Sequence, residues 1–390
     1  MKTTVLPSVV VLDIGYSGYG VLRSLKKYQI PLIGFYGSKI LPESYTRLCD
    51  RKIYFRNNEE LLIKLIEISE SLPLKPVLIL TTDHHVEFYV QNRQELSKRF
   101  LMHMPDSNIV TLLMDKNKFS VYAKENNILI PKSYEVNHKD DIHNLSNELR
   151  YPVIVKPYKH TMEWGDAGFD KAYVISNELK LEKFYQKVSG IEAKLIVQEY
   201  IEGNDDQVEY CLTYFSETCD CQMAFTGKKI RQWPVGTGST ATTVPVNNDF
   251  TKTETIRIFK QLNYRGFGSI EYKYDQRDKR YYLIEPTVGR LNQQEFVATL
   301  SGFNIPLSGY CDITGIDIQP TEHMETEVIY IDEVAEVLST YVHLKRKLLT
   351  LSEWFGSLKG KRYYRFANLS DTGVFCGLII KSIYKLFSFR

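Results

Sequence analysis

Gly268-Ser-Ile-Glu-Tyr-Lys-Tyr-Asp275 and Tyr281-Tyr-Leu-Ile-Glu-Pro286 are two strand-forming runs on either side of a short polar stretch. β-Branched and aromatic residues around such a stretch predict a β-hairpin. A loop of three or five residues pairs positions whose numbers sum to 556, as 271 and 285 do. Glu271 and Glu285 are then expected to face each other, with their side chains about 5 Å apart.

Two facing carboxylates repel each other unless a positive group lies between them. A divalent cation such as Mg²⁺ suits this arrangement, because it binds carboxylate oxygens and can hold phosphate oxygens at the same time. Ser269 and Thr287 are expected to form the next pair on the same face of the hairpin. The alternative is a solvated hairpin whose register is shifted by one residue, which would place the two glutamates on opposite faces.

Upstream of the hairpin, the first hundred residues alternate short apolar runs with helical patterns. This alternation predicts a parallel sheet covered by helices. The expected strands are Val9–Leu12, Pro31–Tyr36 and Val77–Leu80, and the expected helices are Tyr19–Lys27 and Glu59–Ser71.

Three glycines, Gly15, Gly18 and Gly20, mark the first strand-to-helix turn. Their spacing is G-x-x-G-x-G, whereas dinucleotide-binding turns have G-x-G-x-x-G. A structural tight turn, or a loop that binds a substrate anion, is therefore favoured over NAD binding. Further along, Thr81-Thr-Asp83-His84-His85 follows a strand, where it could touch a substrate, although a capped helix start at Asp83 is favoured.

From about residue 106 the pattern becomes a mixture of strands and helices, and after residue 325 it becomes mostly helical. These shifts predict three domains, residues 1–105, 106–325 and 326–390. The expected middle strands are Val153–Lys156, Lys194–Tyr200, Val208–Phe215 and Gln222–Lys228, and the expected helices are Lys116–Asn126, Phe250–Leu262, Asp332–Lys347 and Leu351–Leu358.

Composition excludes several classes of function. The chain has 390 residues, 43% of them hydrophobic, which is enough for two or three domains with cores of their own. Its net charge of +2 gives no reason to expect a nucleic-acid partner. The six cysteines and eight histidines show no zinc-ligand spacing. With no secretion signal and no membrane-spanning run, a cytoplasmic protein is expected.

Four segments, in order, resemble the ATP-grasp family, which includes biotin carboxylase, carbamoyl-phosphate synthetase and D-Ala–D-Ala ligase. Asp115-Lys116 with Asn127-Ile-Leu-Ile-Pro131, Pro152-Val-Ile-Val-Lys156-Pro157, Val197-Gln-Glu199-Tyr-Ile-Glu-Gly203, and the two runs around Glu271 and Glu285 are similar to the family's motifs. The resemblance covers about residues 105–300. It implies an α/β protein with an N-terminal Rossmann-like parallel-sheet domain, an ATP-grasp α+β domain pair and a helical C-terminal tail.

The resemblance also implies cofactors and site residues. ATP with Mg²⁺ is expected, and Mn²⁺ could replace the magnesium. Lys116 and Lys156 would hold phosphates as point charges, Tyr158–Lys171 would be the loop over the phosphates, and Glu199, Tyr200 and Ile201 would read the adenine. Glu209 could touch the ribose, or it could lie on a solvated face. Solvated surface positions are the alternative for the two lysines.

One stretch, Glu285-Pro-Thr287-Val-Gly-Arg290-Leu-Asn292, departs from the family pattern E-x-N-x-R. Thr287 takes the place of the asparagine, so the third metal ligand is left open among Thr287, Asn292 and water. Arg290 comes one place late and could still neutralise the transferred phosphoryl group. The run resembles a carboxylate–amine ligase-like branch that is associated with surface-polysaccharide assembly.

The resemblance implies a ligase that joins a small-molecule carboxylate to an amine through an acyl phosphate. Arg231 could bind the substrate carboxylate, or it could be an exposed strand charge. The alternatives are another ATP-grasp reaction, such as that of a kinase or a carboxylase, a non-catalytic Mg·ATP-binding subunit, and a nicotinamide enzyme. A homodimer is a reasonable expectation.

The last segment, residues 374–390, is apolar with periodic lysines. Helical spacing places Phe375, Ile379 and Ile383 on one side, opposite Lys381 and Lys385. Such a helix could lie in a membrane interface, which would bring the protein to the inner face of the membrane. Packing on the body of the protein or on a second subunit is the alternative.

Overall fold

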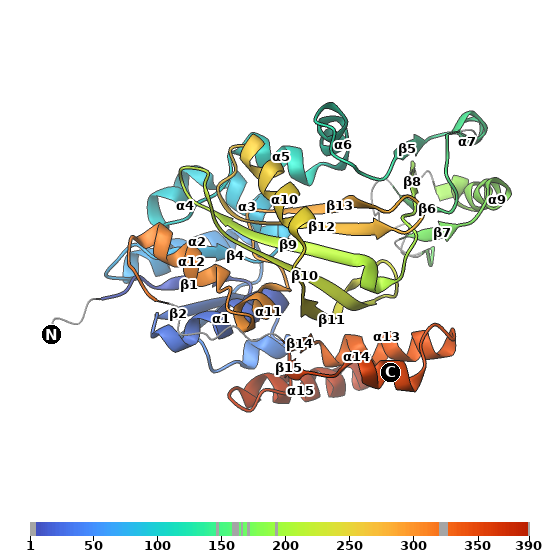
Figure 1. Cartoon of the computed structure of the whole chain (residues 1–390). Helices are drawn as coiled ribbons and strands as arrows, with labels where there is room; N and C mark the ends of the chain where they lie inside the picture. The colour runs from blue at the N-terminus through green and yellow to red at the C-terminus, as the bar shows by residue number, and fades with distance from the viewer. Residues whose placement is uncertain are drawn as a thin grey trace. The chain divides into compact units, whose positions relative to one another are not determined.

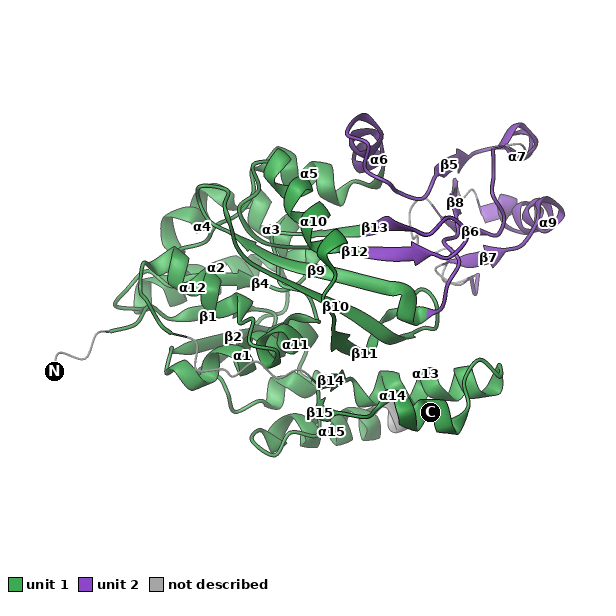
Figure 2. Ribbon diagram, in the orientation of Figure 1, with its two compact units in different colours: residues 1–116, 205–271, 285–390 green, residues 117–204, 272–284 purple. Residues whose placement is uncertain are grey.

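The computed structural model describes residues 5–145, 148–157, 164, 167–169, 172–191, 194–319 and 327–388. The chain forms two compact units (Figure 2). Unit 1 contains residues 1–116, 205–271 and 285–390, and unit 2 contains residues 117–204 and 272–284. Each unit is made of separate stretches of the chain, whereas the three expected domains are consecutive stretches. The expected boundaries, 1–105, 106–325 and 326–390, remain a prediction.

The N-terminal part of unit 1 is a parallel sheet with the strand order β3-β2-β1-β4 (Figure 1). Every residue of β1 and β4 is buried, as expected where helices cover both faces of a parallel sheet. This confirms the predicted α/β start of the chain. The strands are β1 (Val9–Leu12), β2 (Leu32–Tyr36), β3 (Arg51–Tyr54) and β4 (Val77–Leu80), and the helices are α1 (Tyr16–Leu25), α2 (Asn58–Ser71), α3 (Asp83–Gln91), α4 (Arg93–Arg99) and α5 (Ser107–Met114).

The glycine turn between β1 and α1 is needed for close packing. A Cβ on Gly18 would lie 2.1 Å from the carbonyl oxygen of Asp13, and one on Gly20 would lie 2.9 Å from a carboxylate oxygen of Glu295. The Asp13 carboxylate accepts the backbone N–H of Gly15 at 2.9 Å. These contacts support the structural reading of the turn.

A seven-stranded sheet, in the order β13-β12-β9-β10-β11-β14-β15, follows in unit 1 (Figure 1). Its strands are β9 (Val208–Phe215), β10 (Cys221–Trp233), β11 (Ser239–Pro245), β12 (Gly266–Asp275), β13 (Arg280–Val288), β14 (Val328–Ile331) and β15 (Lys361–Tyr364). The helices α10 (Asp249–Gln261), α11 (Glu295–Leu300) and α12 (Ile305–Thr314) accompany it. The outer ends of β12 and β13 belong to unit 2.

The C-terminal region contains α13 (Glu333–Lys345), α14 (Leu351–Ser357) and α15 (Thr372–Ser388). It also supplies β14 and β15, so the expectation of a mostly helical tail missed two strands. The four residues of β14 are buried, because they extend the sheet beside β11. A four-residue apolar run is too short to distinguish a strand from part of a helix by its pattern.

One hydrophobic core joins the two sheets of unit 1. It contains Val21 of α1, Tyr214 and Phe267 of the second sheet, Tyr310 of α12 and Tyr330 of β14, all of them buried. The hydroxyl of Tyr310 also donates to the carbonyl of Pro7 at 2.9 Å. The N-terminal sheet and the second sheet are therefore held as one body.

Unit 2 is built on an antiparallel sheet in the order β5-β8-β6-β7. Its core surrounds Trp164, which is fully buried. The strands are β5 (Ser133–Val136), β6 (Val153–Pro157), β7 (Tyr173–Ile175) and β8 (Leu195–Glu199), and the helices are α6 (Lys116–Glu125), α7 (Lys139–Leu145) and α9 (Glu178–Val188).

The hairpin of β12 and β13 is present, but its connection differs from the expectation. The strands end at Asp275 and begin again at Arg280, which leaves four residues in the loop. The rings of Tyr274 and Tyr281 lie 5.0 Å apart, so both side chains lie on one face near the turn. The predicted register, in which the numbers of paired residues sum to 556, therefore does not hold near the turn.

Candidate active site

Glu271 lies on β12 and is held by two buried side chains. Lys229 of β10 approaches one carboxylate oxygen, with its Nζ 2.8 Å from Oε2. Gln294 donates from Nε2 to the other oxygen, Oε1, at 3.1 Å. The carboxylate is thus fixed in position by a cation and an amide.

Glu285 lies on β13 within electrostatic reach of Glu271. Its side chain is accessible to solvent, yet the protein around it removes enough hydration to raise the pKa of its carboxyl group, and the charge of Glu271 raises it further. The positive charges of Lys116 and Lys229 lower the pKa of Glu285 and so offset part of this rise. The two glutamates therefore interact electrostatically, and their shared role in holding a metal remains a prediction.

Lys229 and Gln294 were not predicted, although they hold Glu271 most directly. The Lys229 side chain is only 4% exposed, and its Nζ also donates to Oε1 of Gln232 at 3.2 Å. The predicted strand Gln222–Lys228 ended one residue before Lys229. Burial of a lysine inside a strand requires an acidic partner, and that partner is more than forty residues away in the sequence.

The face beside Glu271 and Glu285 has polar oxygens that other protein groups do not use. Ser269 and Thr287 are buried on β12 and β13. Within the described part of the chain, Oγ of Ser269 and Oε1 of Gln294 are buried without a hydrogen-bond partner. Asn292 uses its Oδ1 to accept the backbone N–H of Gln293 at 2.8 Å. Gln294 therefore joins Thr287 and Asn292 as a candidate for the third metal ligand.

Arg290 is held by an acidic residue of the N-terminal region. Its Nε lies 2.5 Å from Oδ1 of Asp83, and its Nη2 lies 3.1 Å from Oδ2. Asp83 is the first residue of α3, whose start is capped by the hydroxyl of Thr82. Since the Asp83 charge also raises the pKa of Glu285, this ion pair belongs to the same cluster.

Arg231 was expected to bind a substrate carboxylate, and the structure corrects this expectation. The residue is 3% exposed, and its Nε donates to both oxygens of Glu336 at 2.7 and 2.9 Å. Its Nη1 donates to the hydroxyl of Ser357 at 2.8 Å. A guanidinium enclosed in this way ties β10 to α13 and α14.

Glu209 lies on β9, paired across the sheet with Lys228. Its carboxylate accepts a hydrogen bond from Nδ2 of Asn248 at 2.5 Å, and the Oδ1 of Asn248 caps α10. Glu209 is therefore not a plain solvated charge, and its contact with a ribose remains a prediction.

Within unit 2, Lys156 is half-buried on β6, and its Nζ donates to Oε1 of Gln198 on β8 at 3.3 Å. Lys156 thus lies on the face of β6 opposite Val153 and Val155, which pack in the core of unit 2, and its contact with a phosphate remains a prediction. The predicted phosphate loop, Tyr158–Lys171, lies outside the described residues except for Trp164 and residues 167–169.

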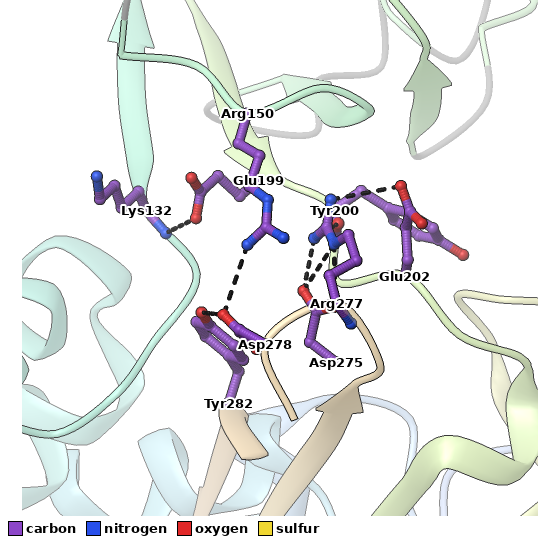
Figure 3. Close-up of polar contacts among 9 residues, drawn as sticks. All are labelled: Lys132, Arg150, Glu199, Tyr200, Glu202, Asp275, Arg277, Asp278 and Tyr282. Atoms are coloured by element: carbon purple, nitrogen blue, oxygen red, sulfur yellow. Dashed lines mark hydrogen bonds and ion pairs between the residues drawn. The ribbon is translucent and has the colours of Figure 1, made fainter. Parts of the chain in front are cut away.

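The predicted adenine-reading segment is already engaged in a polar network of unit 2 (Figure 3). The backbone N–H of Tyr200 donates to the carbonyl of Pro152 at 3.1 Å, and its carbonyl accepts Nη2 of Arg277 at 3.1 Å. The Glu199 carboxylate accepts the backbone N–H of Lys132 at 3.4 Å. Ile201 is buried. The N–H of Tyr200 is thus committed to the protein and is not open to a base.

Arg277, at the tip of the hairpin, organises this network. It makes a two-fold contact with Asp275, at 2.9 Å from Nε to Oδ1 and 2.6 Å from Nη2 to Oδ2. It also lies 3.3 Å from Glu202. Burial raises the pKa of the Asp275 carboxyl, but the Arg277 contacts outweigh it and the pKa is lowered overall. Lys273 places its Nζ 4.5 Å from the ring centre of Tyr200.

Comparisons with known proteins agree with this geometry. Residues 115–305 match the family model described as the ATP-binding domain of the carbamoyl-phosphate synthase L chain. D-aspartate ligase of Enterococcus faecium is 25% identical over 316 residues, which cover 76% of this chain and 74% of that protein. The biotin carboxylase complex of Campylobacter jejuni has a TM-score of 0.60 at 17% identity, covering 83% of this chain and 74% of that one.

N5-carboxyaminoimidazole synthetase of Staphylococcus aureus has a TM-score of 0.59 at 14% identity, covering 83% of this chain and 82% of that one. At such identities the solved structures establish the fold. The family model covers the strands that carry Glu271 and Glu285, and the relative covers three quarters of the chain. Residues 115–305 therefore form an ATP-binding domain of the ATP-grasp type, and three quarters of the chain are similar to an ATP-grasp ligase.

Proposed function

We propose that this protein is an ATP-dependent carboxylate–amine ligase that forms an amide through an acyl-phosphate intermediate. The observation that carries the proposal is the charge cluster of unit 1. In it, Glu271 and Glu285 lie close enough for one to raise the pKa of the other, and Lys116 and Lys229 surround them. Repelling carboxylates beside lysines suit a site that receives a cation together with an anionic phosphate chain.

The residues present fit a bound Mg²⁺. Glu271 and Glu285 would hold it, with Thr287, Gln294 or water completing the ligands. The buried oxygen of Gln294, which has no protein hydrogen-bond partner among the described residues, supports this fit. When bound, the ion would neutralise phosphate charge during transfer.

The protein's own cations would do the remaining work on the phosphates. Lys229 is fixed by Glu271 and Gln232, so its ammonium group needs no reorganisation when negative charge develops nearby. Arg290 is oriented by Asp83, which it can release in favour of a phosphoryl oxygen. From unit 2, we propose that Lys156 holds a phosphate and that Glu199–Ile201 line the adenine.

The proposed reaction has two displacements. A carboxylate oxygen of the first substrate bonds to the γ-phosphorus of ATP, and the bond from that phosphorus to the oxygen of ADP breaks. The nitrogen of an uncharged amine then bonds to the acyl carbon, and the acyl carbon–oxygen bond to phosphate breaks. The amine proton leaves to water or phosphate, and the products are ADP, phosphate and an amide. Catalysis comes from positioning and charge neutralisation.

The printed name of the enterococcal relative supports an amino acid as the carboxylate substrate. We propose an amino acid or a sugar acid, and the resemblance of Glu285–Asn292 to the carboxylate–amine ligase-like branch is the support for a role in cell-surface polysaccharide synthesis. Because its substrate is ATP, we propose that the enzyme acts in the cytoplasm.

A phosphate-release screen tests the proposal. Purified protein with Mg·ATP is incubated with pooled amino acids and sugar acids, with and without pooled amines. Phosphate release that needs both a carboxylate and an amine is the expected result, and Glu271→Ala should abolish it. Deconvolution of the active pools then identifies both substrates.

Other outcomes separate the alternatives. ADP formation with a carboxylate but without any amine would indicate kinase chemistry, and dependence on bicarbonate would indicate a carboxylase. Binding of Mg·ATP without turnover in any pool would indicate a non-catalytic subunit. Each of these results contradicts amide formation.

A further inference from the structure

The C-terminal helix α15 packs on the protein through only one of its faces. A Cβ on Gly377 would lie 2.6 Å from the carbonyl oxygen of Pro42, and one on Gly373 would lie 2.2 Å from that of Tyr45. Val374, on the same face, is fully buried. The glycines therefore let α15 lie directly on the backbone of the 3₁₀ turn Pro42–Tyr45.

The opposite face of α15 is apolar and points to solvent. Phe375, Ile379 and Ile383 lie on this side, whereas Ile380 and Tyr384 stand two turns beyond Gly373 and Gly377, and all five are between 42% and 55% exposed. Lys381 lies on the side of the packed face, as the spacing predicted. The helix thus turns outward the face that an amphipathic helix normally buries.

The neighbouring helix α13 repeats this arrangement. Val334, Val337, Leu338 and Tyr341 recur at the spacing of one helical face, and all four are exposed, Val337 at 67%. The other face of α13 carries Glu336, which is buried against Arg231. On α14, the exposed apolar residues are Leu351 and Phe355, the latter at 65%.

These eleven side chains on α13, α14 and α15 form what we call the C-terminal apolar surface. The three helices lie at the same end of unit 1 (Figure 1). Scattered exposed apolar residues are ordinary, but stripes on three successive helices mark an interaction surface.

Positively charged residues outnumber negatively charged ones around this surface. Residues 334–390, which hold all eleven side chains, contain ten lysines and arginines but only three acidic residues, Glu336, Glu353 and Asp371, although the whole chain has a net charge of only +2. Exposed basic side chains follow α13 at Lys345-Arg-Lys347 and flank β15 at Lys359, Lys361 and Arg362. The apolar stripes are therefore accompanied by an excess of positive charge.

We propose that the C-terminal apolar surface binds the surface of an anionic lipid bilayer. Apolar and aromatic side chains would enter the interface, and the basic residues would meet the lipid headgroups. No described helix is long and apolar enough to cross a bilayer, and α15 has 17 residues, so these helices would lie on the membrane. The proposal does not depend on the reaction that the enzyme catalyses.

Charge also distinguishes a bilayer from a second copy of this chain. A symmetric contact places the same patch on both subunits. Two copies meeting through this surface would bring both excesses of positive charge together, whereas an anionic bilayer complements them. A homodimer through this surface is therefore the disfavoured occupant.

Vesicle co-sedimentation of the full chain tests the proposal. One set of vesicles is pure phosphatidylcholine, and the other is an equimolar mixture with phosphatidylglycerol. We expect binding to the mixed vesicles that weakens at high salt. Ile379→Asp with Ile383→Asp should weaken it at least about tenfold, because two anchoring side chains become charged. Ile63→Asp, an equally exposed isoleucine on α2, is the matched control and should bind like the wild type.

A second variant tests the charge component separately. Lys345→Gln with Lys347→Gln should weaken binding to the mixed vesicles about fivefold per residue at low salt, and the difference should vanish at high salt. Thermal melting of each variant checks the fold, which should be unchanged because the substituted side chains are exposed.

Several results would overturn the proposal. One is no binding to the mixed vesicles, and another is binding that Ile379→Asp with Ile383→Asp leaves unchanged. A third is a concentration-dependent dimer that the same variant converts to a monomer, which would identify a second copy as the occupant. Equal binding to both kinds of vesicle would overturn the role of the basic residues.

Discussion

Glu271 and Glu285 carry like charges, and the protein compensates them unequally. Glu271 has Lys229 at 2.8 Å and Gln294 at 3.1 Å. The pKa of Glu285 is instead raised by the loss of hydration to the surrounding protein and by the charge of Glu271. Ionisation of Glu285 is therefore less favourable in the folded protein than in the unfolded chain, and a bound cation would favour it.

This imbalance predicts opposite effects of one substitution on stability and on metal binding. The pKa of Glu285 lies above its usual 4.5 in the folded protein. The contribution of this group to the free energy of unfolding is therefore present at low pH and is lost as pH rises through the raised pKa. At neutral pH without Mg²⁺, Glu285→Gln should therefore raise the melting temperature. Added Mg²⁺ should then stabilise the wild type but not the variant.

Thermal melting across pH, with and without Mg²⁺, measures both effects. In wild-type protein, Mg²⁺ binding should weaken as pH falls toward the pKa of Glu285, because the ion competes with a proton. A lower melting temperature for Glu285→Gln in metal-free buffer would contradict this account.

Lys229 permits a second prediction at the residue scale. Lys229→Met removes the cation that orients Glu271 and should lower kcat by about a hundredfold or more, as the loss of one preorganised electrostatic contact does elsewhere. Lys252→Met, an exposed lysine on α10, is the matched control. Steady-state kinetics measure the effect, and a change confined to KM would show that Lys229 contributes only to binding.

At the scale of elements, the sequence predicted apolar positions well and the partners of buried charges poorly. The bounds of β1, β4 and β9 agree with the predicted strands residue for residue. The predicted Gln222–Lys228 stopped five residues short of the end of β10 at Trp233. Lys229 and Arg231 made that end look polar, whereas each is buried against an acidic residue that is distant in sequence.

The site shows the same division. Glu271 and Glu285 could be proposed from the sequence because the hairpin that carries them is local, and the charge of Glu271 raises the pKa of Glu285. The contacts of Asp83 with Arg290 and of Gln294 with Glu271 could not be predicted, because they depend on how the N-terminal sheet and the second sheet pack. The loop length of the hairpin was also predicted wrongly. Lys279 closes the turn with a left-handed φ of 57°, a conformation that a lysine in the sequence does not indicate.

The hairpin turn gives a prediction about the Asp275–Arg277 pair. Arg277→Ala leaves the carboxylate of Asp275 buried and unpaired, which should destabilise the fold by about 3–5 kcal/mol at neutral pH. The low pKa of Asp275 stabilises the wild type at neutral pH, and this contribution is lost as pH falls. The difference between variant and wild type should therefore shrink as pH falls below the ordinary Asp pKa of 3.8.

Urea unfolding at several pH values measures this difference. The double variant Asp275→Asn with Arg277→Ala is the control, and it should recover much of the loss because no buried charge remains. A pH-independent difference would show that Arg277 acts through its contacts with Tyr200 and Glu202 instead.

At the scale of the whole molecule, buried ion pairs attach the C-terminal region to the rest of unit 1. Arg231 joins β10 to Glu336 of α13. Arg365 pairs with Glu43 of the N-terminal region and lies 2.6 Å from Asp332. The C-terminal region is therefore part of the folded body and not an appended tail.

The Arg231–Glu336 pair distinguishes this structural role from the substrate role expected for Arg231. Arg231→Met should cost about 3–5 kcal/mol of unfolding free energy, because Glu336 is left buried without its partner. The double variant Arg231→Met with Glu336→Leu should be close to the wild type. Denaturant unfolding measures both, and a raised KM for the carboxylate with unchanged stability would restore the substrate role.

The strand β15 has a consequence for how the chain can be shortened. It is the last strand of the seven-stranded sheet, and it covers β14, whose Val-Ile-Tyr-Ile sequence is fully buried. A chain cut before Lys361 would leave this apolar strand as an open edge, ready to pair with another molecule and aggregate. The exposed, charged side chains of Lys361 and Arg362 disfavour pairing of β15 with another molecule. Truncations meant to improve solubility should therefore keep β15 and also Arg365, because loss of Arg365 would leave Glu43 buried without its partner.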